Sequence, residues 1–416
     1  MDSIRIQGRV ALQGKVRIQG SKNAALPVLA ATLLVGECSF IENCPRISDV
    51  HAMISLLRSM GCTVHWHEKG VSVDSTQVRR GEMPQEAVTG MRSSLCLLGA
   101  LIGRCSEVVM EYPGGCVIGA RPIDLHLSAL EKMGVEFTEK GGKLKAQAQN
   151  LHGAQIQLPI PSVGATENVI LAGVMAEGDT VLTGAALEPE ITALCRYLQD
   201  CGADIEGVGT GRLLIRGGRT LYGTAFRVPS DRIVAGTYLF GCLGAGGSVL
   251  LERAPGEELG AVLNAAGEMG AKVCTAREGV YVQAPDRVGR VHIRTEPYPG
   301  FPTDLQSAAL AASVCCEGVS VIEETIFENR FRIVDELNGM GADIRVQSPR
   351  IVEIRGVERL AGRHMEAKEL RGGAALVIAG LMAEGESFVS GCPYIYRGYE
   401  NICRDFRELG ARVVSV

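Results

Sequence analysis

Apolar stretches of about ten residues recur along the whole chain, each followed by a β-branched segment. The stretches are rich in Ala, Gly and Leu and carry few polar positions, so they predict helices that are buried on nearly all sides. They cover residues 24–34, 94–102, 166–175, 236–243, 305–314 and 373–382. The strands that we expect after them cover residues 37–42, 106–111, 179–183, 248–252, 319–323 and 386–390.

A short phrase with a central glycine also recurs six times, after a helix-like segment and before an alternating, strand-like one. Glycine is suited to ending a helix there because it adopts the left-handed conformation. The glycines are spaced 68–73 residues apart, at Gly61, Gly134, Gly202, Gly270, Gly341 and Gly410. The chain therefore contains six related units. Each is expected to run strand, buried helix, strand, amphipathic helix and strand pair, an α/β architecture.

Units with a fully apolar helix cannot stand alone, so we expect them to associate in two groups of three. The division falls near Pro229 and Ser230, midway along the chain. Residues 4–18 have no partner strand in their own half and are expected to pair with the C-terminal half. We therefore predict one domain of residues 21–229 and another of residues 1–20 plus 230–416. Two chain crossings would link them and form a hinge.

Composition narrows the classes of function. The 416 residues include 42 Lys and Arg against 47 Asp and Glu, a net charge of −5, which argues against a general nucleic-acid or membrane-surface partner. No apolar run reaches the ~18–20 residues that span a bilayer, and the first residues lack the apolar core of a secretory signal. The 14 cysteines are scattered and include no C-x-x-C pair, which favours reduced thiols in a cytoplasm.

Cations stand at the predicted starts of three buried helices, at Lys22, Arg92 and Arg371. The polar neighbours there are explained by helix capping, but a cation is unfavourable at the positive end of the helix dipole unless an anion is present. The pattern indicates an anion-binding site. Loops after the second strands carry further arginines, at Arg121, Arg330 and Arg397. We expect these six side chains to converge in a cleft between the domains, on a polyanionic ligand.

Cys116 differs from the other thiols because it lies in a loop with several Gly and Pro residues, five positions before Arg121. An ordinary cysteine fills a core, but this setting indicates an exposed thiol that acts as a nucleophile or proton donor, in a loop that closes over substrate. The histidines lack metal-ligand spacing, and the sequence has neither a P-loop nor a dinucleotide-binding motif. We therefore expect no metal site.

Six segments together resemble the UDP-N-acetylglucosamine 1-carboxyvinyltransferases, a family of enolpyruvyl transferases. They are residues 21–27, 113–122, 162–166, 301–304, 328–331 and 397–400. The resemblance runs end to end and implies a two-domain inside-out α/β barrel of six βαβαββ units. It implies transfer of the enolpyruvyl group of phosphoenolpyruvate to the 3′-hydroxyl of UDP-N-acetylglucosamine, by addition and elimination, in the first committed step of peptidoglycan synthesis. The family needs no metal or organic cofactor.

The resemblance also implies residue roles. Cys116 matches the proton donor, which forms an adduct with phosphoenolpyruvate and is alkylated by fosfomycin, and Asp304 matches a candidate base. The matches for the donor's phosphate are Lys22, Arg121 and Arg397, and those for its carboxylate side are Arg330 and Arg371. The nucleotide pocket is expected to include Asn23, Arg92, Pro122, Ile123, Asp124, Leu125, Ser162, Val163, Gly164, Asp304 and Ile326.

Four positions depart from the family pattern. Glu369 and Tyr396 stand where the family has Asp, Val234 stands where it often has Glu, and Ile160 replaces a polar residue. Glu369 keeps a carboxylate on a longer stem, so either Asp304 or Glu369 is a candidate for taking the sugar proton. Two alternatives remain open at this point. One is a 5-enolpyruvylshikimate-3-phosphate synthase with the same donor, and the other is a protein that binds UDP-sugar without turnover.

Overall fold

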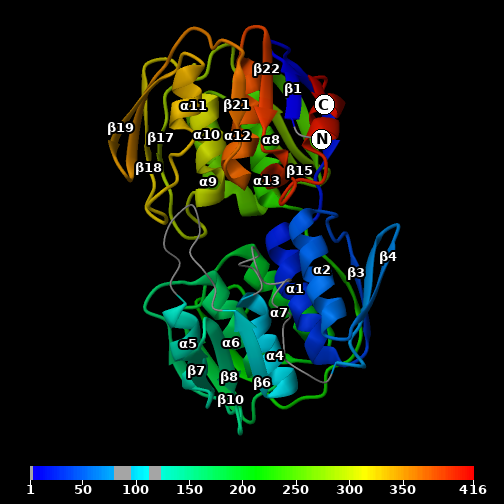
Figure 1. The fold of residues 1–416 in the computed structure, drawn as a ribbon. Coiled ribbons are helices and arrows are strands. Elements are labelled where there is room, and N and C mark those ends of the chain that lie inside the picture. The colour runs from blue at the N-terminus through cyan, green and yellow to red at the C-terminus, as the bar shows by residue number, and fades with distance from the viewer. Residues whose placement is uncertain (1–2, 79–94, 112–122) are drawn as a thin grey trace. The chain divides into compact units, whose positions relative to one another are not determined.

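In a computed structural model of the chain, residues 3–78, 95–111 and 123–416 are described, and they form two compact units. Residues 3–19 and 230–416 make up the terminal unit, and the described part of residues 20–229 makes up the central unit (Figure 1). The chain passes between the units at residues 19–20 and again at residues 229–230. The hinge expected at these two crossings stays a prediction.

The terminal unit contains three sheets of four strands, each with a parallel first pair followed by two antiparallel neighbours. In spatial order they are β2 (Leu12–Arg17), β14 (Gly247–Glu252), β16 (Gly279–Gln283) and β15 (Lys272–Ala276); β17 (His292–Arg294), β18 (Val319–Glu323), β20 (Ile351–Arg355) and β19 (Asp343–Ser348); and β21 (His364–Glu366), β22 (Glu386–Ser390), β1 (Ser3–Gln7) and β23 (Arg412–Ser415).

Two sheets of the central unit repeat this pattern, and the third has three described strands, all antiparallel to their neighbours. Its sheets are β13 (Ala225–Arg227), β3 (Cys38–Glu42), β5 (Gly70–Asp74) and β4 (Thr63–His67); β6 (Glu107–Glu111), β8 (Lys143–Gln147) and β7 (Glu136–Lys140); and β9 (Gln155–Gln157), β10 (Asp179–Thr183), β12 (Arg212–Arg216) and β11 (Asp204–Glu206). The six strands expected after the buried helices are all present.

The opening segment pairs with the C-terminal half, as predicted, but it forms two strands and not one. β1 lies antiparallel between β22 and β23, and it completes the sixth sheet. β2 runs parallel to β14 in a different sheet, while β13 takes the equivalent place beside β3. The chain changes sheets at Gly8, where an added Cβ would lie 2.1 Å from the carbonyl oxygen of Ala383. A side chain there would block this close approach.

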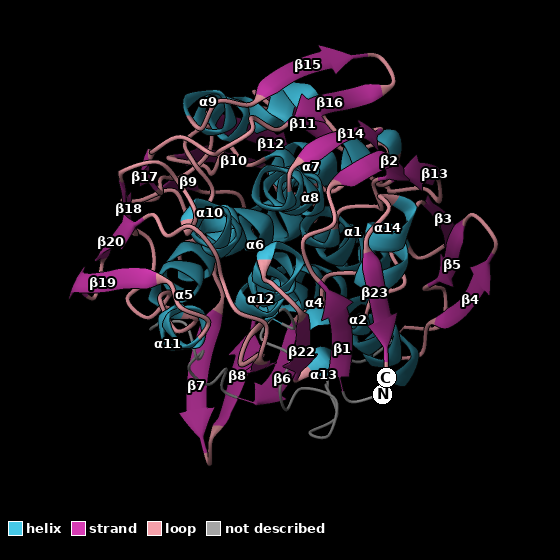
Figure 2. Cartoon of the chain, turned by 90° about the horizontal axis from the view of Figure 1, so that it is seen from above, coloured by secondary structure: helices cyan, strands magenta, loops and turns pink. Residues whose placement is uncertain are grey.

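Six helices with almost no exposed surface form the centres of the units, and the strands lie around them (Figure 2). In the central unit they are α1 (Lys22–Val35), α4 (Leu97–Cys105) and α6 (Val163–Gly173). In the terminal unit they are α8 (Arg232–Ala245), α10 (Gln306–Ser313) and α12 (Leu370–Met382). The helices of each unit pack on one another, so the predicted inside-out arrangement is confirmed. No helix of the described residues is long and apolar enough to cross a membrane.

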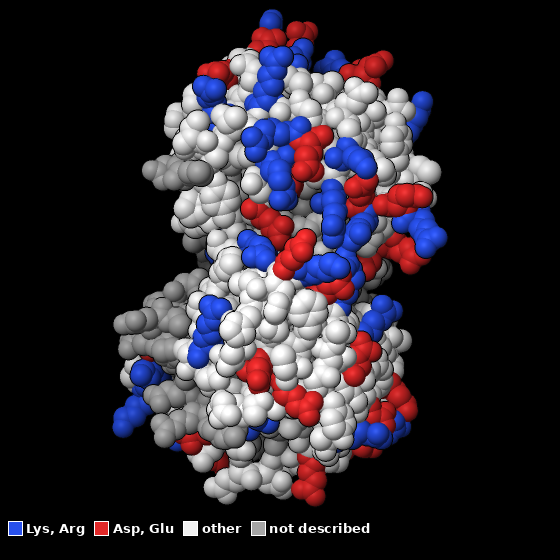
Figure 3. All heavy atoms as spheres, turned by 90° about the vertical axis from the view of Figure 1, so that its right-hand side faces the viewer, with Lys and Arg blue, Asp and Glu red and all other residues white. Residues whose placement is uncertain are grey.

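The amphipathic helices lie between the second strand of a unit and its strand pair. They are α2 (Ser48–Ser59), α5 (Asp124–Glu131), α7 (Pro189–Asp200), α9 (Gly260–Glu268), α11 (Val334–Gly339) and α14 (Ile402–Glu408), with a 3-10 turn η2 (Gly256–Leu259) before α9 and a short helix α13 (Cys392–Ile395) before α14. Acidic and basic side chains are interleaved on the face drawn in Figure 3. Exposed ion pairs also occur within one helix, as between Arg404 and Glu408 of α14, 3.8 Å apart.

All six repeated glycines end helices through the same pair of backbone hydrogen bonds. At the first, the N–H of Gly61 donates to the carbonyl of Arg58, and the N–H of Cys62 donates to that of Leu57. The equivalent bonds occur at the other five positions, and the glycine φ angles lie between 85° and 105°. This is the Schellman motif, which closes the helix and satisfies its last carbonyls. The six-unit prediction is therefore confirmed in local geometry.

Replacement of Gly341 by Ala tests this role, because an added Cβ at Gly341 would meet nothing within 4 Å and the φ angle is 100°. We expect Gly341→Ala to lower the free energy of unfolding by about 1–2 kcal/mol through backbone strain alone. Gly267 in α9 is a matched control with equally open space and no positive φ. There Ala should raise stability by about 0.5–1 kcal/mol. Equal effects in urea unfolding would contradict the argument.

Candidate active site

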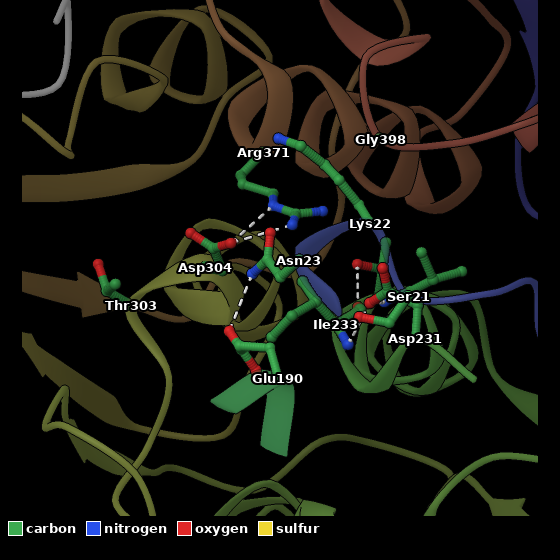
Figure 4. A network of polar contacts seen from close by, with 12 residues as sticks. Ser21, Lys22, Asn23, Glu190, Asp231, Ile233, Thr303, Asp304, Arg371 and Gly398 are labelled. Atoms are coloured by element: carbon green, nitrogen blue, oxygen red, sulfur yellow. Dashed lines mark hydrogen bonds and ion pairs between the residues drawn. The ribbon is translucent and has the colours of Figure 1, made fainter. Parts of the chain in front are cut away.

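In the terminal unit, one carboxylate lies between two buried arginines. Asp304 belongs to the turn η3 (Thr303–Leu305) that leads into α10. Its Oδ1 accepts from Arg330 Nη2 at 2.6 Å. Its Oδ2 accepts from Arg371 Nη2 at 3.0 Å and from Arg371 Nε at 3.3 Å (Figure 4). The side chains of Arg330 and Arg371 are 2% and 4% exposed, whereas that of Asp304 is 27% exposed. Three residues predicted for the site therefore form one cluster.

Glu369 lies beside this cluster as the N-cap of α12. Its Oε2 accepts from the N–H of Arg371 at 2.8 Å, and its Oε1 accepts from the N–H of Gly372. The nearest approach of its carboxylate to Arg330 is 3.8 Å, from Oε2 to Nη1. A carboxylate at a helix N-terminus satisfies free N–H groups and opposes the dipole. The longer stem of Glu369 thus serves helix capping, and its suggested role as an acid–base group stays a prediction.

The electrostatic setting of Arg371 is unusual for a buried side chain. Burial by itself lowers the pKa of the guanidinium, but Asp304, Tyr399 and Asp231 together outweigh it, so the pKa of Arg371 is raised. The Nη1 of Arg371 is buried and has no hydrogen-bond partner among the described residues. Its guanidinium carbon lies 5.9 Å from the centroid of the Tyr399 ring. A permanently charged group with an unused donor suits an anionic ligand.

Gln19 holds the segment that carries Arg397. Its Nε2 donates to the carbonyl of Gly398 at 3.1 Å, and its Oε1 accepts from the N–H of Glu400 at 2.8 Å. Its own carbonyl accepts from the N–H of Asp231, the residue that caps α8. One buried amide therefore joins the end of the opening segment to two parts of the terminal unit that are distant in sequence. Arg397, which directly precedes Gly398, is half-buried. Its role at the phosphate stays a prediction.

In the central unit, the predicted site residues at the start of α1 have acidic partners. Lys22 Nζ lies 2.8 Å from Asp49 Oδ2, and both side chains are nearly buried, at 15% and 6% exposure. Asn23 Nδ2 donates to Glu190 Oε1 at 3.3 Å (Figure 4). A cation at a helix start is expected to need a nearby anion. For Lys22 and Arg371 the protein itself supplies one, since Asp49 and Asp304 lie against them.

The start of α6 carries the next predicted segment. Ser162 caps the helix by accepting from the N–H of Ala165 at 3.4 Å, and Val163 and Gly164 form its first turn. An added Cβ at Gly164 would lie 2.7 Å from His126 Cε1, so the glycine allows α5 to approach α6. The residues predicted from α5 and its cap differ in exposure: Ile123 is buried, Leu125 is half-buried and Asp124 is exposed.

Four predicted site residues lie outside the described residues: Arg92, Cys116, Arg121 and Pro122. Their positions, and the predicted cleft in which the two sets of residues face each other, stay predictions. The 13 described cysteines are free thiols, most of them buried, in agreement with the expected core role. Among residues 3–78, 95–111 and 123–416, no group of three or more His, Cys, Asp or Glu side chains could hold a metal ion.

The departures from the family pattern have structural settings. Tyr396 is half-buried, and its hydroxyl lies 3.4 Å from Ser415 Oγ. Val234 is fully buried in α8, where its N–H donates to Asp231 Oδ1 at 3.1 Å. Ile160 is 61% exposed. None of these three side chains contributes a charge to the cluster around Asp304.

Sequence reasoning missed Glu167, a buried carboxyl group in α6. Burial is the largest cause that raises its pKa, and the neighbouring carboxylates of Glu190 and Glu188 add to the rise, which brings the pKa to about 8. A single charged residue inside an otherwise apolar stretch was the available signal. Asp49 and Glu190 were missed as partners of Lys22 and Asn23, because contacts between different helices leave no pattern in sequence.

Comparisons with known proteins agree with this fold. The sequence model of the EPSP synthase (3-phosphoshikimate 1-carboxyvinyltransferase) family matches residues 6–406. The solved enolpyruvyl transferase NikO from Streptomyces tendae superposes with a TM-score of 0.88 at 24% identity, over 99% of this chain and 98% of that one. EPSP synthase from Acinetobacter baumannii superposes with a TM-score of 0.74 at 21% identity, over 100% of both chains.

The chain therefore belongs to the EPSP synthase family of carboxyvinyltransferases, which are enolpyruvyl transferases. More specific relatives within it are named UDP-N-acetylglucosamine 1-carboxyvinyltransferase. One from Caldanaerobacter subterraneus subsp. tengcongensis is 43% identical over 417 residues, and one from Saccharophagus degradans is 44% identical over 420 residues, each covering 100% of both chains. The family resemblance expected from the sequence motifs is confirmed.

Glu167 predicts a specific pH dependence of stability. Its pKa is about 8 in the folded protein against the ordinary 4.5, so the folded state holds a proton that the unfolded state loses. Stability from this group is complete below pH 4.5 and is lost as the pH rises through 8. Between pH 5 and pH 8 this group should lower the free energy of unfolding of the wild type by on the order of 3 kcal/mol. In Glu167→Gln this part of the pH dependence should be absent.

The fluorescence of Trp66, the single tryptophan and a residue of the central unit, reports this unfolding. The exposed Glu177 provides a matched control, and Glu177→Gln should leave the pH profile of the wild type unchanged. An identical profile for Glu167→Gln and wild type would show that the buried carboxyl group does not hold its proton.

Proposed function

We propose that this chain transfers the enolpyruvyl group of phosphoenolpyruvate to the 3′-hydroxyl of UDP-N-acetylglucosamine and releases phosphate. The observation that carries the proposal is the 43–44% identity, over the full length of both chains, to enzymes named for this reaction. The product would enter peptidoglycan synthesis. The cytoplasmic location and the restriction to these two small-molecule substrates belong to the same proposal.

The cluster around Asp304 supports the acceptor half of the chemistry. The sugar hydroxyl must lose its proton as its oxygen bonds to C2 of the donor, so a carboxylate near that oxygen is required. In the present arrangement both oxygens of Asp304 accept from arginines. The carboxylate of phosphoenolpyruvate is a competing acceptor for Arg330 and Arg371. Its arrival would draw the guanidinium groups toward the substrate and release Asp304 to act as the base.

The donor half needs a proton at the C3 methylene and cations near the phosphate. In our proposal Cys116 delivers that proton during addition. Elimination from the tetrahedral ketal then returns a proton from C3 to the Cys116 thiolate and breaks the bond between C2 and the phosphate oxygen, so that phosphate leaves. Lys22 would interact with both Asp49 and the phosphate. This is supported by its place at a helix start, where Lys22 Nζ lies 2.8 Å from Asp49 Oδ2. Arg121 and Arg397 would complete the phosphate contacts. This mechanism assigns no step to a metal or organic cofactor.

A second candidate acceptor is shikimate 3-phosphate, because the matching family model is described as 3-phosphoshikimate 1-carboxyvinyltransferase. We expect phosphate release from phosphoenolpyruvate with UDP-N-acetylglucosamine and none above background with shikimate 3-phosphate. A coupled phosphate assay with each acceptor at saturation measures both. Release with shikimate 3-phosphate alone would reverse the assignment. Nucleotide binding without release would instead identify a binding protein.

The proposed role of Cys116 gives a second test. Cys116→Ser should lower kcat by at least about 100-fold, because a hydroxyl is a far poorer acid than a thiol and proton transfer is worth about 10²–10⁴-fold. In the wild type, fosfomycin should alkylate Cys116 in the presence of UDP-N-acetylglucosamine, as measured by peptide mass spectrometry. Cys274, an exposed thiol, is the matched control, and Cys274→Ser should retain activity. An unmodified Cys116 after prolonged incubation would refute its assignment.

A further inference from the structure

Glu324 is a fully buried carboxylate next to two segments of the candidate site. It follows β18 directly and is 0% exposed. Its Oε1 accepts from the N–H groups of Ile326 at 2.8 Å and Phe327 at 3.1 Å. Its Oε2 accepts from the hydroxyl of Thr303 at 2.9 Å. The two oxygens thus serve different segments, the loop at residues 326–327 and the turn η3.

Thr303 carries the connection onward to the cluster around Asp304. Its hydroxyl oxygen accepts from Arg330 Nε at 3.3 Å, while its carbonyl accepts from Arg330 Nη2 at 3.2 Å. The same Nη2 donates to Asp304 at 2.6 Å. Because the Thr303 hydroxyl accepts from Arg330 and also donates its proton to Glu324, it fixes the direction in which the guanidinium points.

The backbone of Glu324 is itself well held. Its N–H donates to the carbonyl of Arg350 at 2.8 Å, and its carbonyl accepts from Arg350 Nη1 at 3.2 Å. The carboxylate is therefore anchored to β18 and to the turn before β20, and it is not free to follow the loop. A fixed acceptor of this kind can set the positions of the groups that donate to it.

We infer that Glu324 is a positioning residue for the transfer reaction. It would orient Arg330 and Asp304 through Thr303, and it would separately hold the backbone at Ile326 and Phe327. The inference rests on the proposed function, in which Asp304 and Arg330 act at the reacting groups, and on the place in the nucleotide pocket that the family resemblance implies for Ile326. It adds that one buried carboxylate coordinates the chemical step with recognition of the nucleotide.

The two oxygens allow the two roles to be separated by mutation. Glu324→Gln keeps a carbonyl oxygen for the two N–H groups but replaces the acceptor of the Thr303 proton by an amide. We expect kcat to fall on the order of tenfold, since a charged hydrogen bond is lost, with little change in KM for UDP-N-acetylglucosamine. Glu324→Ala removes both acceptors, so this KM should also rise on the order of tenfold.

Changes at Thr303 provide an independent route to the same answer. Thr303→Val keeps the shape and removes the hydroxyl, and it should lower kcat as much as Glu324→Gln does. Thr303→Ser restores the hydroxyl and should recover most of the turnover. Combining Thr303→Val with Glu324→Gln should cause less loss than the product of the single effects, because both interrupt one connection. Glu358→Gln is the matched control, since Glu358 is an exposed carboxylate of the same unit, and it should leave kcat and KM unchanged.

Steady-state kinetics of the full chain, with thermal midpoints measured alongside, decide the matter. A fall in kcat for Thr303→Val that Thr303→Ser reverses supports the inference. Lower thermal midpoints with unchanged kcat and KM would mean that Glu324 only stabilises the fold, and the inference would be wrong. If the wild type releases no phosphate with UDP-N-acetylglucosamine, the proposed function fails and the inference fails with it. Normal turnover by both the wild type and Glu324→Gln overturns the inference alone.

Discussion

The structure depends on one constraint: its six central helices are buried along nearly their whole length. A helix of this kind has no solvated face, so polar residues are tolerated mainly at its ends, where backbone N–H groups need partners. The candidate site residues accordingly occur at helix starts. Lys22 and Asn23 lie in the first turn of α1, and Ser162 caps α6. Asp304 lies just before α10, and Arg371 lies in the first turn of α12. Burial of the helix bodies thus determines where chemistry is available in this fold.

Charges at these helix starts are balanced locally. Asp49 opposes Lys22, and Asp304 opposes both Arg330 and Arg371. An unpaired buried cation would be strongly destabilising, so these carboxylates keep the protein folded when no substrate is bound. They also become competitors of an anionic substrate. The net charge of −5 is therefore no guide to ligand charge, because the relevant cations lie inside the protein and are already neutralised.

The repeat could be predicted from sequence because each unit ends a helix with a glycine, and left-handed backbone geometry restricts that choice. The helix starts and the pairing of the opening segment followed from hydrophobic pattern. Other features could not be predicted in this way. The break between β1 and β2 depends on the approach of Gly8 to Ala383. The role of Glu324 depends on its hydrogen bond with Thr303, 21 positions away, and that of Gln19 on its hydrogen bond with Gly398, 379 positions away. Such contacts are set by packing and leave no periodic signal.

Asp304 and Glu369 differ in a way that bears on which of them takes the sugar proton. Both oxygens of Glu369 accept backbone N–H groups of α12, and its side chain is 10% exposed. Protonating it would remove an acceptor that the helix start requires. The carboxylate of Asp304 accepts from the side chains of Arg330 and Arg371, and the side chain of Asp304 is 27% exposed. Side chains can turn toward a substrate, whereas the helix N-terminus cannot move away. In the proposed reaction we therefore expect Asp304 to act as the base, whereas Glu369 is better suited to fixing the helix that carries Arg371.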